Sequence, residues 1–214
     1  MKLFQKNIAE QYQEEQKPHK DTRFIRKLKN ASSTIVLLIA APLLALFITS
    51  HIFHSYEVDG LSMYSTLDHG DRLIVYKLAK TVSNLNGSDY YLSRGDVIVF
   101  DRPVEISAPN SVKHLIKRVI ALPGERITVK DGKVTVYNSD FPDGFDPDKG
   151  QDYAANLSKT TGSVDIKVDK NEVFVMGDNR TNSTDSRTFG PISTDLVVGN
   201  AVARFLPINA MRKL

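Results

Sequence analysis

A serine and a lysine in this sequence stand in surroundings that could support nucleophilic catalysis. Ser62 lies in the segment VDGLSMYSTL, where Gly60 permits close backbone approach and the other neighbours are largely apolar. Lys117 lies in HLIKRVIALPG, a run that predicts a strand with Lys117 on the same face as Leu115 and Val119. If that face is buried, desolvation lowers the pKa of the lysine, and a neutral lysine can take the proton of a serine hydroxyl.

Each of these two residues also has a plainer interpretation. A lone serine in a loop is usually just a polar surface residue. Lys117 and Arg118 could be two solvated cations on an edge strand, with the lysine reaching water along its flexible side chain. The distance between the Ser62 hydroxyl and the Lys117 amine separates these alternatives, because direct proton transfer requires hydrogen-bond reach.

A third polar segment, FVMGDNRTNSTDSRTFGPI at 174–192, begins as a strand and then turns. Beyond the turn its charges alternate in sign: Asp178, Arg180, Asp185 and Arg187. Ordinary ion pairs of a surface loop would explain this pattern, and each contributes little to stability. The functional alternative is a rigid loop that holds a polar side chain such as Ser183 against an active site.

The composition of the 214 residues narrows the possible classes of protein. With 28 basic and 25 acidic residues the net charge is only +3, which does not suggest a nucleic-acid-binding protein. The chain has no cysteine, so disulfides, a thiol nucleophile and cysteine-based zinc sites are excluded. Its five histidines are scattered and form no H-E-x-x-H pattern, so we predict neither a metal nor a cofactor.

The N-terminal part of the sequence predicts a membrane anchor. Residues 1–30 are polar and include a basic run, and residues 31–53 contain the uncharged stretch TIVLLIAAPLLALFI within about the length that a membrane-spanning helix needs. A cleaved secretory signal is the alternative, but no A-x-A sequence follows the apolar run, which favours an uncleaved anchor. Because basic residues stay on the cytoplasmic side, we expect residues 1–30 to be cytoplasmic and residues from about 54 onward extracytoplasmic.

Residues 54–214 predict a mainly β domain behind this anchor. Runs rich in β-branched residues and bounded by Gly, Asp or Pro predict strands at Leu73–Tyr76, Asp96–Phe100, Leu115–Leu122, Arg126–Val129, Lys133–Tyr137, Glu172–Met176 and Val197–Phe205. Asp131-Gly132 indicates a hairpin turn, since a type I′ turn needs positive φ at both positions. Only a weak helical pattern lies near 76–83. Residues 138–163, rich in Gly, Pro, Asp and Ser, predict a long loop or polar insert outside the core.

Four segments resemble, in order and spacing, the motifs of the bacterial type I signal peptidases, or leader peptidases. Residues 62–67, SMYSTL, match the family's nucleophile motif S-M-x-P-T-L, and residues 95–100, GDVIVF, match its G-D-[IV]-[IV]-V-F strand. Residues 116–124, IKRVIALPG, match the segment with the general-base lysine. Residues 177–187, GDNRTNSTDSR, match G-D-N-R-x-x-S-x-D-S-R, which is highly specific. The resemblance implies a signal-peptidase-like β fold and a Ser–Lys catalytic dyad.

The resemblance also implies a role for each matching residue. Ser62 would be the nucleophile, with its backbone N–H holding the oxyanion, and Lys117 would be the general base, oriented by a hydrogen bond from Ser183. The other matches would brace or build the loop, namely Asp185 with Arg187, and Asp178 and Arg180. The substrates would be secretory preproteins, cut after a small-x-small sequence beside the lipid of a bacterial cell membrane.

Three positions depart from the family pattern. Gly60 stands where some members have a serine whose hydroxyl also binds the oxyanion, so that donor is absent here. Ser65 replaces the usual proline, which frees one φ angle without touching a catalytic group. The sequence ALPGE at 121–125 replaces the commoner Gly-Leu-Pro-Gly-Asp, and we expect no functional effect.

Two other functions compete with this interpretation. Self-cleaving repressor proteins also use a Ser–Lys dyad on a β fold, but they are cytosolic, and the predicted anchor and residues 177–187 argue against that class. A membrane-tethered β domain that only binds a partner would leave Ser62 and Lys117 far apart.

Overall fold

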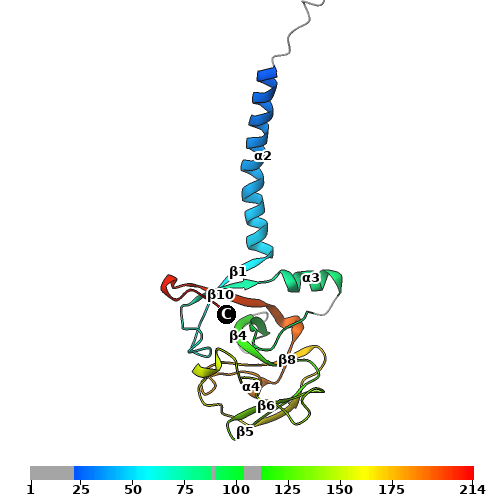
Figure 1. Ribbon diagram of the computed structural model, residues 1–214, viewed down its shortest axis with the longest axis vertical. Coiled ribbons are helices and arrows are strands. Elements are labelled where there is room, and N and C mark those ends of the chain that lie inside the picture. The colour runs from blue at the N-terminus through cyan, green and yellow to red at the C-terminus, as the bar shows by residue number, and fades with distance from the viewer. Residues whose placement is uncertain (1–21, 88–89, 104–111) are drawn as a thin grey trace, which may run out of the picture. The chain divides into compact units, whose positions relative to one another are not determined.

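The computed structural model describes residues 22–87, 90–103 and 112–214, and the chain divides into two compact units after Leu46. Helix α2 (Thr22–His51) begins in the first unit (Figure 1). Between Ile35 and Phe47 its large apolar side chains are exposed, and Pro42 lies inside the helix. The predicted apolar segment is therefore helical.

The structure describes only part of the anchor predicted for residues 31–53. No helix in the described part of the chain is long and apolar enough to cross a membrane. The side chains of residues 31–33 and 49–51 lie outside that part, as does most of the predicted cytoplasmic segment, so the anchor and its orientation stay predictions. The helix ends at His51, and a strand begins at Phe53, where the anchor was predicted to end.

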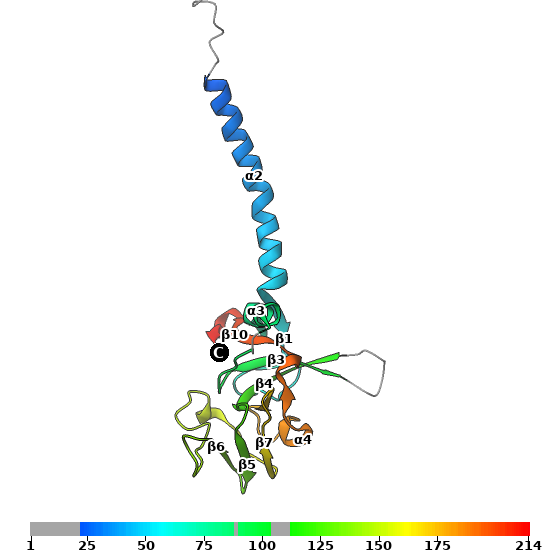
Figure 2. The same cartoon turned by 90° about the vertical axis from the view of Figure 1, so that its right-hand side faces the viewer.

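The second unit is built from antiparallel strands, which form two sheets within the described residues. Eight strands form the larger sheet in the order β1-β2-β10-β3-β4-β8-β9, with β11 paired to β10. Their bounds are β1 (Phe53–Glu57), β2 (Arg72–Tyr76), β3 (Val97–Pro103), β4 (Val112–Ala121), β8 (Glu172–Met176), β9 (Ile192–Ser193), β10 (Val197–Leu206) and β11 (Arg212–Lys213). The smaller sheet has the order β6-β5-β7, from β5 (Arg126–Lys130), β6 (Lys133–Tyr137) and β7 (Val164–Lys167) (Figure 2). The mainly β class is thus confirmed for this unit.

Strand β4, which carries Lys117, is an inner strand of the larger sheet. It pairs with β3 on one side, where Ile98 lies opposite Lys117, and with β8 on the other, where Met176 lies opposite Arg118. Both cations are buried, with exposed fractions of 3% and 4%. The alternative of two solvated cations on an edge strand is therefore wrong.

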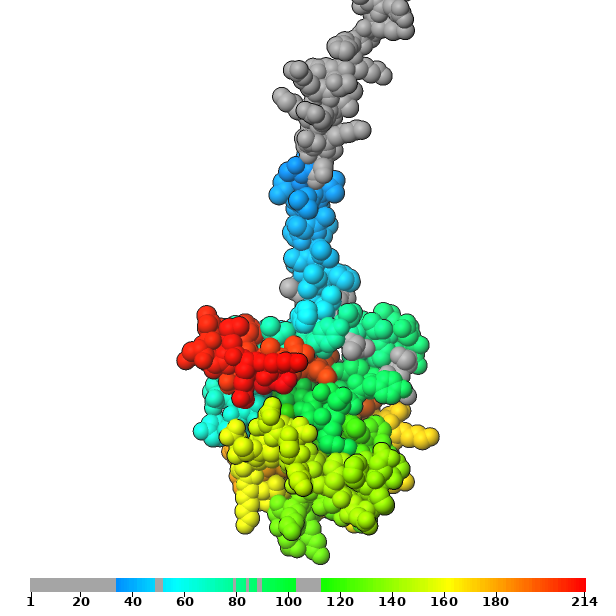
Figure 3. Space-filling view, in the orientation of Figure 1, coloured from blue at the N-terminus to red at the C-terminus, as the bar shows by residue number. Residues whose placement is uncertain are grey.

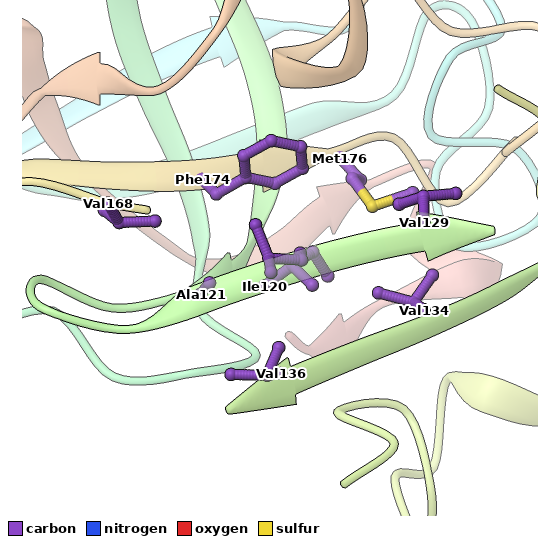
Figure 4. Packing of buried hydrophobic residues seen from close by; sticks show 9 residues of the cluster. Ile120, Ala121, Val129, Val134, Val136, Val168, Phe174 and Met176 are labelled. Carbon is purple, nitrogen blue, oxygen red and sulfur yellow. The ribbon is translucent and has the colours of Figure 1, made fainter. Parts of the chain in front are cut away.

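The smaller sheet packs against the larger one through a continuous apolar core. Figure 4 shows this packing, in which the buried residues are Ile120, Ala121, Ile127, Val129, Val134, Val136, Val168, Phe174 and Met176. A second core cluster includes Val58, Met63 and Leu67, which belong to the loop between β1 and β2. Burying a large apolar side chain contributes roughly 1.5–3 kcal/mol, so these residues fix both the sheets and the loop.

The sequence predicted β2, β3, β4, β5, β6, β8 and β10 and missed four outer strands, β1, β7, β9 and β11. The hairpin turn is confirmed, since φ is 52° at Asp131 and 80° at Gly132. Helix α3 (Leu78–Asn86) lies slightly later than the weak helical pattern near 76–83. Residues 138–163, which we call the polar insert, contain little regular structure beyond a 3-10 helix at Ala154–Asn156.

Candidate active site

The loop between β1 and β2 holds Ser62 on a rigid base. Met63 and Leu67 insert into the core with exposed fractions of 1% and 0%, which explains much of the apolar character around the serine. The N–H groups of Thr66 and Leu67 donate to the carbonyl oxygen of Met63 and close a turn directly after Ser62. Ser62 itself is half-buried, so its hydroxyl is fixed by its neighbours and still lines a cleft.

Lys117 extends from β4 to this hydroxyl. Its Nζ donates to Ser62 Oγ at 2.7 Å and to the carbonyl oxygen of Ile116 at 2.9 Å. At this separation a proton can pass between the two side chains without a mediating water. The two residues that the sequence presented separately therefore meet in one site.

Burial changes the proton affinity of Lys117. Desolvation lowers the pKa of the amine from 10.5 to about 8, and the positive charge of Lys113 acts in the same direction. The carboxylates of Asp185 and Asp178 oppose the shift, because they favour the protonated amine. In mildly alkaline solution a substantial fraction of the amine is therefore neutral, which is the form that can accept a proton.

The loop after β8 lies directly against the Ser62 backbone. The N–H of Asn179 donates to the carbonyl oxygen of Ser62 at 3.0 Å, and its side chain donates to the carbonyl oxygen of Leu61 at 3.1 Å. Gly177 permits this approach, because a Cβ there would overlap the Ser62 carbonyl oxygen and Ser183 Oγ. We assigned no role to Asn179 from the sequence, although it lies in the turn after Gly177 and matches the asparagine of the family motif.

Asp185 and Arg187 fix the other end of this loop. Asp185 is fully buried at the start of α4 (Ser186–Phe189) and accepts from the Gly177 N–H at 3.0 Å and from the Arg187 guanidinium at 2.8 and 2.7 Å. Burial alone would raise the pKa of Asp185, but the hydrogen bonds from Arg187 and Gly177 outweigh it and hold the pKa below its ordinary value. This geometry fits the bracing role that the resemblance implies.

Ser183 lines the same cleft without forming the expected hydrogen bond to Lys117. Its Oγ is buried and has no hydrogen-bond partner among the described residues, although Ser183 helps to lower the pKa of Asp185. Lys117 donates instead to Ser62 and Ile116. Buried hydroxyls without a partner are uncommon and cost free energy. The orienting role of Ser183 stays a prediction.

Two buried ion pairs join the loop after β8 to the rest of the unit. Asp178 accepts from the Arg118 guanidinium at 2.9 and 2.6 Å. Arg180 is 1% exposed and donates at 2.8 Å to Asp148 of the polar insert. The structural roles suggested for Asp178 and Arg180 fit these contacts, but nothing local in the sequence pointed to Arg118 or Asp148 as partners.

The serine and the lysine line one cleft of about 650 Å³, together with Ser183. Gly60 lies in the wall of this cleft. Its φ of 99° is a backbone conformation that residues other than glycine rarely adopt. Within the described residues, no group of three or more His, Cys, Asp or Glu side chains could hold a metal ion. The site therefore places a serine hydroxyl beside a buried amine in an open cleft.

Known proteins of one family resemble this chain over most of its length. The family described as "Signal peptidase, peptidase S26" matches residues 31–206. Signal peptidase I T of Bacillus subtilis (strain 168) is 35% identical over 178 residues, covering 82% of this chain and 86% of that protein. Signal peptidase I of Bacillus amyloliquefaciens is 33% identical over 204 residues, covering 94% of this chain and 98% of that protein. A solved signal peptidase I from Enterococcus faecalis V583 is 26% identical, covers 53% of this chain and 98% of that one, and gives a TM-score of 0.38.

Proposed function

This chain belongs to the signal peptidase family, peptidase S26, and is a serine endopeptidase that cleaves signal peptides; on that premise we propose that Ser62 and Lys117 form its catalytic dyad. The observation that carries the proposal is the 2.7 Å contact between Lys117 Nζ and Ser62 Oγ. A domain that only binds a partner has no need of this pairing, or of a lysine whose pKa burial lowers to about 8.

The reaction proceeds through an acyl-enzyme. Neutral Lys117 takes the proton of the Ser62 hydroxyl as its oxygen attacks the scissile carbonyl carbon, and the ammonium then gives a proton to the departing amine as the C–N bond breaks. Lys117, neutral again, takes a proton from a water molecule that attacks the ester carbonyl. The returned proton regenerates the Ser62 hydroxyl and releases the new carboxyl end, so no proton is gained or lost by the dyad.

The oxyanion of each tetrahedral intermediate is held by the backbone N–H of Ser62. Gly60 supplies no side-chain donor, and its φ of 99° makes the serine found there in some relatives a strained substitution in this chain. One oxyanion donor typically stabilises the transition state by about 3 kcal/mol, so catalysis here depends more strongly on the backbone N–H of Ser62.

The substrates are secretory preproteins, cut after small-x-small sequences, and the enzyme is anchored in the bacterial cell membrane. The exposed apolar side chains between Ile35 and Phe47 support the anchor, since a helix that is apolar all round normally lies in protein or lipid. The basic residues before the helix support a cytoplasmic N-terminus and an extracytoplasmic catalytic domain. No nucleic acid and no cofactor takes part.

Incubation of the detergent-solubilised full chain with a secretory preprotein, followed by mass determination of the products, tests this proposal. We expect one cut after a small-x-small sequence. Lys117→Arg should be inactive although folded, because arginine keeps its proton, whereas Lys130→Arg, at an exposed position at the end of β5, should cleave normally. A folded Lys117→Arg protein that cleaves at a near-normal rate would rule out the dyad.

A further inference from the structure

The polar insert, residues 138–163, touches all three segments that build the active site. These segments are the loop after Ser62, strand β4 beside Lys117 and the loop after β8. The insert does not pack flush against them, because a cavity of about 400 Å³ is lined by Tyr153 of the insert together with Thr66 and Arg118. Three separate polar contacts therefore join the insert to the site.

The first contact reaches the loop after β8. The Arg180 guanidinium is 1% exposed and binds both carboxylate oxygens of Asp148, at 2.8 and 2.7 Å. The same loop receives further bonds from the insert, since Ser158 Oγ accepts from the Thr181 N–H at 3.1 Å and contacts Asn179 Oδ1 at 3.3 Å. Asn179 is the residue that donates to the Ser62 carbonyl oxygen.

The second contact reaches β4 at the residue next to Lys117. The guanidinium carbon of Arg118 lies 3.7 Å from the centre of the Tyr153 ring, which is stacking distance. The Tyr153 hydroxyl donates to Asp148 at 3.1 Å. One carboxylate of the insert thus connects to both Arg180 and, through Tyr153, Arg118.

The third contact reaches the loop that carries the nucleophile. Ser65 Oγ donates to the carbonyl oxygen of Asn156 at 2.9 Å. Figure 3 shows the insert, in yellow-green, lying against the cyan residues of this loop. The proline that relatives have at this position has no hydroxyl, so this bond depends on the departure at Ser65.

We infer that the polar insert is a positioning element for the Ser62–Lys117 pair, and that Asp148 is its central positioning residue. The inference rests on the proposed function. Asp148 touches no reacting atom and acts through Arg180 on the loop after β8, which contacts Ser62, and through Tyr153 on strand β4, which carries Lys117. A displacement of about 1 Å between reacting groups can lower the rate by up to a hundredfold. A modest loosening of the insert should therefore lower kcat.

Asp148→Asn tests the inference, with Asp165→Asn as the matched control. Asp165 is also an aspartate paired with an arginine, Arg126, but this pair is exposed on the smaller sheet. With a preprotein as substrate, we expect kcat of Asp148→Asn to fall roughly ten- to a hundredfold with KM almost unchanged. Asp165→Asn should match the unsubstituted protein in both quantities.

The pH profile separates positioning from a general loss of stability. The charged groups that act on Lys117 are Asp185, Asp178 and Lys113, and desolvation is the larger influence on its pKa. Loosening the loops admits water, so the acid limb of kcat should move to higher pH, and part of the lost activity should return in alkaline solution. A variant that is merely less stable would keep the original limb at temperatures below its unfolding.

A second pair of variants covers the case in which Asp148→Asn does not fold. Tyr153→Leu removes the ring stacked on Arg118, and Tyr137→Leu removes a ring near Arg126 on the smaller sheet. We expect only Tyr153→Leu to lower kcat and shift the acid limb. If the unsubstituted protein cleaves preprotein, and a folded Asp148→Asn or Tyr153→Leu keeps its kcat and pH profile, the positioning role is refuted while the dyad stands. If the unsubstituted protein cleaves nothing, the proposed function itself fails.

Discussion

Burial lowers the pKa of Lys117, which suits its amine to act as a base, but the same burial makes the folded protein less stable when the amine is charged. The unfolded side chain titrates near 10.5, whereas the folded one, desolvated on β4, titrates near 8. Between these two pH values the unfolded chain binds the proton more tightly, so the free energy of unfolding rises with pH in this window. Below it, the folded protein holds a buried cation at a cost of about 3 kcal/mol.

Lys117→Met should therefore make the protein more stable and inactive. Near neutral pH we expect the free energy of unfolding to rise by as much as about 3 kcal/mol, less the hydrogen bonds that are lost. The gain should shrink as the pH approaches 10.5, because the unsubstituted lysine is then neutral in the folded state and half neutral in the unfolded state. Urea unfolding at neutral and alkaline pH measures this difference, with exposed Lys130→Met as the control. Equal stability differences at both pH values would show that desolvation is not the cause.

Ser183 is a second buried polar group of the cleft, and its hydroxyl has no hydrogen-bond partner among the described residues. Because Ser183 Oγ makes no hydrogen bond among the described residues, Ser183→Ala should leave the stability unchanged or slightly higher. If the hydroxyl orients Lys117 during the reaction, kcat should nevertheless fall by roughly fivefold or more, the equivalent of about 1 kcal/mol. Thermal unfolding and steady-state kinetics, with exposed Thr188→Ala as control, give both numbers. An unchanged kcat would remove Ser183 from the site.

At the scale of elements, the sequence predicted strands that have a local apolar pattern and missed strands and ion pairs that depend on contacts between distant residues. Inner strands such as β8 can be recognised in the sequence by runs of buried β-branched and other apolar residues. Strand β1 does not, because its FHSYE side chains are mostly exposed and its existence depends on pairing with β2. The ion pair between Arg180 and Asp148 joins distant positions that carry no shared pattern. For the same reason, the residues alone left the roles of Ser62 and Lys117 open, and only the resemblance assigned them.

The close approach of the loop after β8 to the nucleophile loop gives an element-scale prediction. Gly177→Ala should push these two elements apart, since its Cβ would overlap the Ser62 carbonyl oxygen and Ser183 Oγ. We expect a large loss of kcat even at temperatures where the variant is folded. Gly199→Ala is the matched control, because its Cβ would crowd the Tyr76 backbone where β10 pairs with β2, away from the cleft. Comparable loss of kcat in both folded variants would point to general destabilisation.

At the scale of the whole molecule, the basic and apolar N-terminal segments of the sequence fall mainly in the first compact unit, and the predicted β domain falls in the second. The uncharged residues of α2 lie in the part before the boundary at Leu46 or just beyond it, and the candidate site lies wholly in the unit from Phe47 to Leu214. The helix and the catalytic unit can thus serve separate purposes. The helix would hold the chain at a membrane, and the β unit would carry out the hydrolysis.

The proposed orientation can be measured because the chain has no cysteine. A single cysteine then reports one position, introduced as Gln13→Cys before the helix or as Asp140→Cys at an exposed position in the polar insert. Basic residues before an apolar helix stay in the cytoplasm, so a membrane-impermeant maleimide applied to intact cells should label Asp140→Cys alone. Gln13→Cys should react only after the membrane is permeabilised, and cleavage of a preprotein confirms that each variant is folded. Labelling of Gln13→Cys from outside intact cells, with Asp140→Cys protected, would reverse the orientation and place the catalytic unit on the wrong side for exported substrates.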